Sequence, residues 1–255
     1  MDNKSFDYKR IAQGYKNRPF LHKQVMEQLK SDMNVRHFQN GLDVGCGAGL
    51  STKGLKLICD NVTGTDISEE MILAAKEMCG EKEYSFFVSK AENIPKPDKL
   101  YDIVTAAGVI SWIDETEFLR NTSQIMEKEG ILLIYDFWIS DNMREVPEYT
   151  DWFNNEYLKT FPKPPRKEKI WKNENVAPYG LLIQKQTTYQ MEYEFDKDSF
   201  VQFMMIQSNV NAKIEGEGKN IEEVKEWFDN SLDKIFNGKT RKLLFSGYSW
   251  YIIKK

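Results

Sequence analysis

The sequence predicts an α/β protein built on a doubly wound sheet of seven strands, mostly parallel with an antiparallel edge pair, and carrying a helical lid inserted after the fifth strand. Between residues 40 and 138, short apolar or β-branched runs alternate with amphipathic stretches, as in repeated βα units. The first run leads directly into a glycine-rich turn. Two more strand-like runs follow an irregular stretch, so they can complete the sheet as its antiparallel edge pair.

The regular part predicts five strands with three helices between them. The strands are expected at residues 41–44, 62–66, 84–88, 103–106 and 131–137. The helices are expected at residues 50–59, 69–79 and 115–128. Ser68 has the character of an N-cap, because its hydroxyl can accept a backbone bond and acidic residues follow it. Residues 20–29 have apolar side chains at helical spacing, so the segment 1–38 is expected to supply a helix that closes the ligand site.

The second half of the chain breaks this pattern. Residues 141–180 are rich in aromatic residues, proline and lysine, and their Pro-Lys-Pro-Pro stretch excludes a continuous helix or a central strand. We therefore interpret 141–180 as the inserted lid and assign 39–140 and 181–255 to the core. Within the later part, strands are expected at residues 181–195 and 243–253, and helices at 198–206 and 221–236.

Composition limits the functions to consider. The 35 basic and 39 acidic side chains leave a net charge of −4, so the broad positive field that nucleic-acid binding uses is not expected. Three cysteines without CxxC spacing suggest neither a disulfide framework nor a zinc site, and no metal is expected. The N-terminus lacks an apolar signal region, and no apolar run approaches the roughly 18 residues of a membrane span. A soluble cytoplasmic protein is the expectation.

The glycine-rich turn is Gly45-Cys-Gly-Ala-Gly49, at the carboxyl edge of the first predicted strand, where open α/β sheets bind ligands. Glycine permits the unusual dihedral angles and the close ligand approach that such a turn needs. A dinucleotide-binding turn would place its third glycine at position 50, which is Leu50 here. Asp43 would also sit awkwardly beside a pyrophosphate, whereas it can order the loop and reach a ligand's amino group through water. The turn therefore favours a ligand without phosphates.

Asp66 ends the second predicted strand and can accept hydrogen bonds from two ribose hydroxyls. The same carboxylate could instead be an acid at the start of a helix, next to Ser68. Following the Asp-Val-Gly-Cys-Gly-Ala-Gly run, the ribose role is favoured.

Three segments in order resemble the class I S-adenosylmethionine-dependent methyltransferases, which have a Rossmann-like fold. They are Leu-Asp-Val-Gly-Cys-Gly-Ala-Gly at 42–49, Gly-Thr-Asp-Ile-Ser at 64–68, and Ala-Glu-Asn-Ile-Pro at 91–95 followed by the run 101–114. The chain is similar there to the methyltransferase type 11 group, which includes ubiquinone-pathway and trans-aconitate methyltransferases. The resemblance covers residues 41–137 and implies S-adenosylmethionine as cofactor, with S-adenosylhomocysteine as product.

The resemblance also implies roles for particular residues. The glycine turn would contact the methionine and ribose parts of the cofactor, Asp66 and Ile67 the ribose and adenine, and Arg18 the carboxylate through its planar fork. The full set of implied cofactor-binding residues is Tyr15, Arg18, Asp43, Gly45, Cys46, Gly47, Gly49, Asp66, Ile67, Ala91, Glu92, Ala106, Ala107 and Gly108.

Methyl transfer is an in-line displacement from a sulfonium centre, in which positioning and exclusion of water carry most of the acceleration. An amine or hydroxyl acceptor needs a base, and Asp136, at the end of the fifth predicted strand, is placed for that work. Position alone is weak support for that role, so a polar strand terminus or helix-cap partner is the favoured interpretation of Asp136. Trp112 is a candidate substrate-binding residue near the predicted mouth. His22 and His37 have no ligand partners in sequence and are expected to be packing or surface residues.

A small-molecule acceptor is the leading hypothesis, because the insertion would supply a closed aromatic pocket. The alternatives are an RNA or protein methyltransferase that uses the basic stretches 159–172 and 238–242, a cofactor-binding protein without catalysis, and, last, an NAD-dependent oxidoreductase. The sequence does not predict the acceptor or the oligomeric state.

Overall fold

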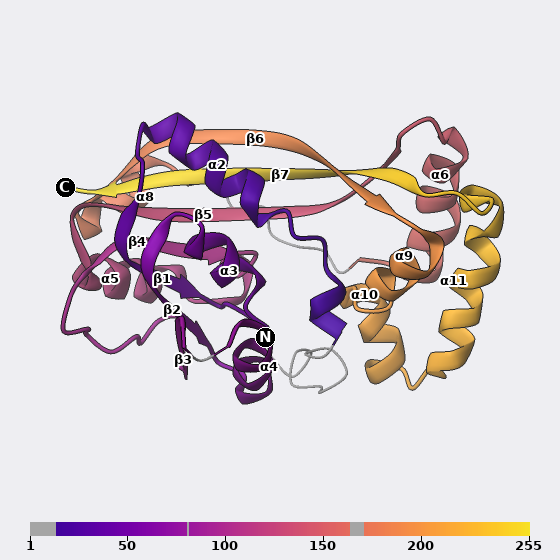
Figure 1. Cartoon of the computed structure of the whole chain (residues 1–255), viewed down its shortest axis with the longest axis horizontal. Coiled ribbons are helices and arrows are strands. Elements are labelled where there is room, and N and C mark those ends of the chain that lie inside the picture. The colour runs from indigo at the N-terminus through magenta and orange to yellow at the C-terminus, as the bar shows by residue number, and fades with distance from the viewer. Residues whose placement is uncertain (1–13, 81, 164–170) are drawn as a thin grey trace.

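The computed structural model describes residues 14–80, 82–163 and 171–255, and its centre is a mixed sheet of seven strands (Figure 1). The strand order is β3-β2-β1-β4-β5-β7-β6, with β7 antiparallel to both neighbours and the remaining pairs parallel. The strands are β1 (Phe38–Val44), β2 (Cys59–Asp66), β3 (Tyr84–Val88), β4 (Tyr101–Ala107), β5 (Met126–Met143), β6 (Leu181–Phe195) and β7 (Arg241–Lys254). The predicted fold class, with its antiparallel edge pair, is confirmed.

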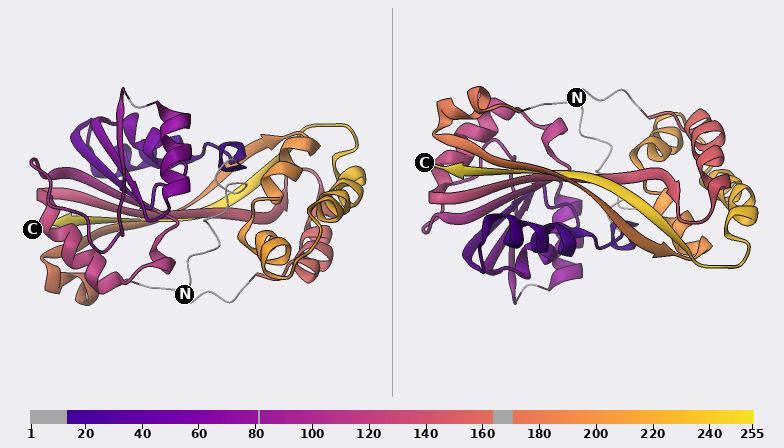
Figure 2. Two further views of the ribbon diagram at one scale, coloured as in Figure 1. Left: turned by 90° about the horizontal axis from the view of Figure 1, so that it is seen from below. Right: turned by 90° about the horizontal axis from the view of Figure 1, so that it is seen from above.

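Helices cover both faces of this sheet (Figure 2). α2 (His22–Met33) and α3 (Leu50–Lys56) bury their apolar sides on one face, where Val25 and Leu55 belong to the same cluster as Leu133 of β5. On the other face α5 (Glu115–Ile125) packs Phe118 and Leu119 against Val104. The continuous burial of residues 103–106 in β4 and 130–135 in β5 fits this arrangement, because successive side chains of a strand point to opposite faces and both faces are covered.

The helix starts follow the sequence closely. α4 (Glu69–Cys79) begins after Ser68, whose side chain accepts the Met71 backbone N–H at 3.3 Å, so the predicted N-cap is confirmed. α3 and α5 end earlier than predicted. The reason is that buried residues at their predicted ends, Cys59 and Met126, are the first residues of β2 and β5.

β5, β6 and β7 extend well beyond the other four strands and carry a group of helices at their far end (Figure 1). We call this the distal helical group. It comprises α6 (Pro147–Asp151), the π-helical turn η4 (Trp152–Tyr157), α7 (Leu158–Thr160), α9 (Lys197–Met204), α10 (Ser208–Asn211), the π-helical turn η6 (Ala212–Gly216) and α11 (Ile221–Phe236).

An aromatic core joins the two parts of the distal helical group. Phe161 stacks on Phe228 with ring centroids 5.3 Å apart, and Trp152 stacks on Tyr157 at 5.6 Å. Segments before β6 and after β6 therefore share one core. The sequence placed 181–255 entirely in the methyltransferase core, whereas in the structure its helices 197–236 pack with the first part of the insertion.

The second part of the insertion lies at the opposite end of the long strands. α8 (Asn173–Val176) and the 3-10 turn η5 (Ala177–Tyr179) lead into β6 beside α5. Trp171 stacks on Trp250 of β7 at 5.3 Å and donates to Glu115 of α5 at 3.1 Å. The residues 141–180 thus divide between two ends of the molecule, where the sequence predicted a single lid.

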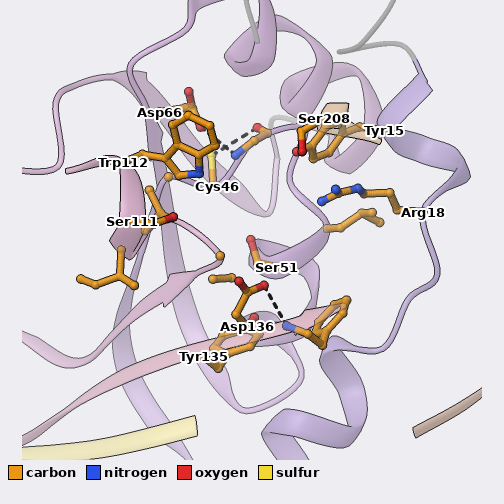
Figure 3. A pocket seen from close by; sticks show the side chains of 18 of the residues that line it. Tyr15, Arg18, Cys46, Ser51, Asp66, Ser111, Trp112, Tyr135, Asp136 and Ser208 are labelled. Atoms are coloured by element: carbon orange, nitrogen blue, oxygen red, sulfur yellow. Dashed lines mark hydrogen bonds between the residues drawn. The ribbon is translucent and has the colours of Figure 1, made fainter. Parts of the chain in front are cut away.

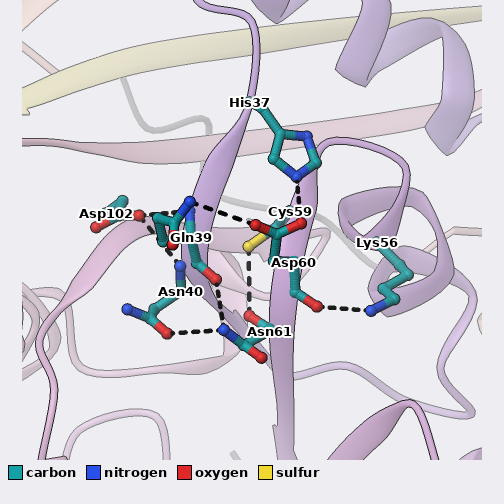
Figure 4. A network of polar contacts seen from close by, with 8 residues as sticks. All are labelled: His37, Gln39, Asn40, Lys56, Cys59, Asp60, Asn61 and Asp102. Carbon is teal, nitrogen blue, oxygen red and sulfur yellow. Dashed lines mark hydrogen bonds and ion pairs between the residues drawn. The ribbon is translucent and has the colours of Figure 1, made fainter.

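A polar network joins the amino ends of β1, β2 and β4 (Figure 4). His37 Nε2 lies 2.7 Å from Asp60 Oδ1, and Asp102 accepts the Gln39 backbone N–H at 2.6 Å. His37 is exposed there, as expected of a surface histidine. This edge is opposite to the carboxyl ends of the parallel strands, where the glycine turn lies.

Within residues 14–80, 82–163 and 171–255, no helix has the length and apolarity to cross a membrane. Nor do these residues contain a group of three or more His, Cys, Asp or Glu side chains arranged to hold a metal ion.

Candidate active site

A cavity of about 960 Å³ lies at the carboxyl ends of β1, β2 and β4 and continues along β5 (Figure 3). The strand order reverses between β1 and β4, and open α/β sheets bind their ligands at such a switch point. β5 continues past the last β4 pair, Ala107 with Tyr135, and its residues 135–139 form a wall of the cavity. The distal helical group closes the far side through residues 203 and 206–209.

The glycine turn forms the end of the cavity above β1. Gly45, Gly47 and Gly49 all have positive φ, at 65°, 53° and 90°, which explains the residue type at each position. A side chain on Gly47 would start 3.4 Å from the Tyr15 ring, so this part of the loop packs closely against the N-terminal segment. The loop is anchored by the Cys46 backbone N–H, which donates to the Thr65 carbonyl at 2.9 Å.

Asp66 at the end of β2 accepts two backbone hydrogen bonds. Its Oδ2 accepts from Gly47 and its Oδ1 from Ser68, both at 2.9 Å. The carboxylate therefore ties the glycine turn to the start of α4, and it also lines the cavity. Each carboxylate oxygen has a second lone pair, so these bonds leave capacity for a ligand hydroxyl.

Asp43 lies under the turn, fully buried, and not in the cavity wall. Its carboxylate accepts hydrogen bonds from Ser51 at 2.6 Å and from Thr52 and Thr105 at 2.7 Å. Burial raises the pKa of Asp43 to about 6, although the three hydroxyl donors act in the other direction. In this position Asp43 joins β4 to the first turn of α3, so it orders the segment that follows the loop.

Most of the residues singled out from the sequence meet at this one cavity. Those in its wall are Tyr15, Arg18, Gly45, Cys46, Gly47, Asp66, Ile67, Ala91, Glu92, Ala107, Gly108, Trp112 and Asp136. Asp43, Gly49 and Ala106 lie behind the wall and are buried.

Asp136 occupies the middle of the cavity floor (Figure 3). Its Oδ1 accepts the Phe137 backbone N–H at 2.8 Å. A Cβ built on Gly108 would lie 3.1 Å from the same oxygen, so the carboxylate abuts the loop after β4. Asp136 is therefore next to the place where the resemblance puts the methionine part of the cofactor.

Sequence reasoning missed the pair formed by His22 and Tyr135. His22 Nδ1 lies 2.8 Å from the Tyr135 hydroxyl, both residues line the cavity, and both are buried. Burial, and secondarily the positive charge of Arg18, lower the pKa of His22 to about 3, so its imidazole is neutral. One signal was present: His22 shares a helical face with Met26 and Leu29, which are buried.

Away from the glycine turn the cavity wall is rich in aromatic residues. Trp138 of β5 lies beside Tyr248 and Trp250 of β7, while Phe137 and Ile139 of β5 pack in the cluster of Phe203 of α9. Tyr248 is paired with Asp136 across the β5–β7 ladder, and its ring is 5.3 Å from that of Trp250. No sequence pattern brings these residues together, because the β5–β7 register connects distant parts of the chain.

A glycine turn after β1, an acid at the end of β2 and a cavity at the switch point of a seven-stranded sheet fit the class I S-adenosylmethionine-dependent methyltransferases that the sequence resembles. Residues 42–134 match the family model described as "Methyltransferase domain". The resemblance of this part of the chain to a methyltransferase domain, found in the sequence, is thus confirmed.

Curated relatives agree with that assignment. The chain is 29% identical to a malonyl-acyl-carrier-protein O-methyltransferase of Porphyromonas gingivalis over 117 residues, which are 45% of this chain and 44% of the relative. It is 31% identical to a ubiquinone biosynthesis O-methyltransferase of Rickettsia bellii over 43% of this chain and 47% of the relative. The chain thus spans a little under half the length of these relatives.

Solved structures resemble the chain over most of its length. A protein assigned as a type II methyltransferase from Anaeromyxobacter dehalogenans superposes with a TM-score of 0.65 at 18% identity, over 91% of this chain and 94% of that one. The YcgJ protein of Bacillus subtilis gives 0.52 at 17% identity, over 91% and 98%. At such identities the likeness is one of fold.

Proposed function

We propose that the protein transfers the methyl group of S-adenosylmethionine to a small-molecule acceptor by in-line displacement. The observation that carries the proposal is the shape of the cavity. It has the glycine turn and Asp66 at one end and an aromatic wall of β5 and β7 at the other. Its volume of about 960 Å³ is at the upper end for small-molecule sites, which leaves space for an acceptor beside the cofactor.

The cofactor end has suitable groups for each part of the molecule. Arg18 lies across the cavity from Asp136 (Figure 3), and among the described residues its buried Nε has no hydrogen-bond partner, which suits a ligand carboxylate. Asp66 would accept the ribose hydroxyls while keeping its two backbone bonds. Ile67 is 47% exposed at the mouth, where an apolar side chain can cover one adenine face, with Ala91 and Glu92 beside it.

The chemistry supplied by the bound cofactor is an electrophilic methyl group on a sulfonium. The protein's own residues orient and enclose the reactants, which is where most of the rate enhancement of such a displacement arises. Gly108 fixes the distance between the loop after β4 and Asp136. Asp136 would remove a proton from a hydroxyl acceptor, and Trp112 would line the acceptor's path.

Two further points belong to this proposal. The relatives named above are O-methyltransferases, which supports oxygen as the accepting atom. The three cysteines are free thiols, which fits a reducing compartment, and we therefore place the protein in the cytoplasm.

Calorimetry tests the cofactor assignment. S-adenosylhomocysteine and S-adenosylmethionine should bind with one site per chain. NAD should show no comparable affinity, because Leu50 replaces the third glycine of a dinucleotide turn. Equal affinity for NAD would remove the basis of the proposal.

A further inference from the structure

We propose that His22 is an acceptor-binding residue, which donates a hydrogen bond from Nε2 to an anionic oxygen, such as a carboxylate, of the molecule to be methylated. This inference rests on the proposed function and deepens it, since it names the chemistry of the acceptor at the same site.

The hydrogen bond with Tyr135 determines which nitrogen of the His22 imidazole carries the proton. Tyr135 is 1% exposed, and within the described ranges the partner of its hydroxyl is His22 Nδ1, at 2.8 Å. If Nδ1 carried a proton, the buried Tyr135 O–H would have no acceptor there, at a cost of about 1–3 kcal/mol. Tyr135 therefore donates to Nδ1, and the proton of the neutral ring is on Nε2.

The Nε2 atom of His22 is available to a ligand in the cavity. His22 is 8% exposed and lines the cavity. Across the residues described by the structure, Nδ1 carries the hydrogen bond of this side chain and Nε2 carries none. A buried ring packed between Tyr135 and Phe137, with centroids 5.8 and 5.1 Å away, thus presents an N–H donor to the cavity. Because His22 lines the cavity, a ligand bound there could accept a hydrogen bond from this donor.

The surroundings of His22 bear on the charge of the ligand group that it would bind. The guanidinium of Arg18 acts on His22 as a positive charge and helps to keep the ring neutral. Because Arg18 is proposed to bind the cofactor carboxylate, its charge is offset once the cofactor is bound. The preference for a negative oxygen at Nε2 then rests on the greater strength of hydrogen bonds to charged acceptors. Because Nε2 is a donor in this tautomer, His22 does not remove a proton. His22 would therefore bind an anionic group of the acceptor, and removal of a proton from a hydroxyl of that acceptor stays with Asp136.

His22 lies beside the part of β5 that extends beyond β4. His22 packs on Phe137, which lies on β5 beyond its last pair with β4. The glycine turn follows β1 and the Gly108 loop follows β4, whereas Phe137 belongs to the extension of β5 beyond β4. The neighbouring wall is aromatic, which suits an acceptor with a flat apolar body.

Three variants isolate the cavity donor. His22→Asn places an amide near the position of Nδ1, so it keeps a partner for Tyr135 and removes the donor at Nε2. His22→Gln places its amide near the position of Nε2 and restores that donor. Tyr135→Phe removes the hydrogen bond that fixes the tautomer. All three should bind S-adenosylhomocysteine within about twofold of the wild type, since their contacts lie on the acceptor side.

Nitrogen-15 NMR of the full chain with S-adenosylhomocysteine gives the decisive measurement. The His22 ring should be neutral at pH 7 with its proton on Nε2. Benzoate and 2-naphthoate should shift the Nε2 resonance, and should bind about tenfold more tightly than benzamide and 2-naphthamide, because a charged acceptor strengthens the bond. His22→Asn should lose about tenfold in carboxylate affinity, and His22→Gln should recover most of it.

A proton on Nδ1, a charged ring at pH 7, or no response of His22 to either acid would overturn the inference. So would a His22→Asn variant that binds the acids as the wild type does, or one that loses S-adenosylhomocysteine instead. Failure of the wild type to bind S-adenosylhomocysteine would instead count against the proposed function.

Discussion

Asp66 connects three parts of the cofactor site through one carboxylate. Its two oxygens accept backbone bonds from Gly47 and Ser68, and the side chain also borders the cavity. The helix-start role that the sequence left open is thus present in the structure. The ribose role remains a prediction, and substitution can separate the two.

In Asp66→Asn the amide keeps the shape but has one acceptor oxygen, so it cannot serve both backbone donors and a ribose. We expect S-adenosylhomocysteine affinity to fall by roughly ten- to a hundredfold, since bonds to a charged acceptor contribute about 1.5–3 kcal/mol. Stability should fall by only about 1 kcal/mol, because asparagine also serves at helix starts. Asp60→Asn on the same strand, at the opposite edge, is the matched control. A lower melting temperature with unchanged affinity would exclude the ribose role.

The raised pKa of Asp43 predicts that the stability of the folded protein depends on pH. Its pKa is raised to about 6 in the folded protein by burial, against an ordinary value near 3.8, so the folded state holds this proton more tightly than the unfolded chain. The Asp43 contribution to stability is therefore fully present below about pH 4 and is lost as pH rises through about 6.

Asp43→Asn should remove that loss, since its oxygen can accept from Ser51 and Thr52 while its amide donates to Thr105. The variant should gain stability relative to the wild type between pH 4.5 and 7.5, by on the order of 3 kcal/mol at most. Thermal unfolding at both pH values measures this. A difference that does not change with pH would contradict the assigned pKa.

Among individual residues, the sequence predicted the site residues whose position follows from a short local pattern. The glycine turn and Asp66 stand next to their strands in the chain, so their positions follow from short-range geometry. His22 and Tyr135 are more than a hundred positions apart and meet because α2 packs on β5. A histidine without a metal or catalytic partner in sequence gives no sign of such a contact.

Among the elements, the turn between β1 and α3 is the most sensitive to substitution. Gly47→Val would put a branched side chain at φ 53°, beginning 3.4 Å from Tyr15. We expect S-adenosylhomocysteine binding to fall by more than a hundredfold, with native circular dichroism and a loss of about 1–3 kcal/mol. Gly180→Val is a control for backbone strain alone, because it has φ 70° and open space around it. Normal cofactor binding by Gly47→Val would show that the turn does not hold the cofactor.

The extent of β5 shows where element prediction fails. Its predicted range was 131–137, yet the strand runs to Met143 through Ser140-Asp-Asn, which has the composition of a turn. These three residues form a bulge opposite Leu244, and the strand continues because Ile139 pairs with Phe245 before it and Met143 with Leu243 after it. Such pairing overrides local propensity and is not visible in a single segment. The sharing of the distal helical group between 147–161 and 197–236 was missed for the same reason.

For the molecule as a whole, the distribution of charge bears on the partner. Lys239 of the basic segment 238–242 lies beside Asp196 and Asp198 at the far end of β7, away from the cavity, and Lys242 is 4.0 Å from Glu192. Acidic neighbours thus offset the basic charge in this segment. Of the other basic stretch, residues 164–170 lie outside the described residues.

We therefore expect no salt-sensitive RNA binding near physiological ionic strength. Phosphate contacts release counterions, so real RNA affinity would fall steeply as salt increases. Fluorescence anisotropy with a labelled single-stranded RNA, at low and at physiological salt, measures this. A tight complex at low salt that weakens several-fold would favour the RNA methyltransferase alternative.

The position of β7 between β5 and β6 also has a kinetic consequence. β6 precedes β7 in the chain but has no other partner in the sheet, and β5 pairs Ile131 with Ile253. Both antiparallel ladders therefore form only when β7, the last strand in the chain, pairs with β5 and β6. Contacts between residues so far apart in sequence slow folding. Until then the edges of β5 and β6 are open to other chains. Refolding should accordingly be slow and yield should fall with protein concentration, even though the βα units of the first half can form from local contacts.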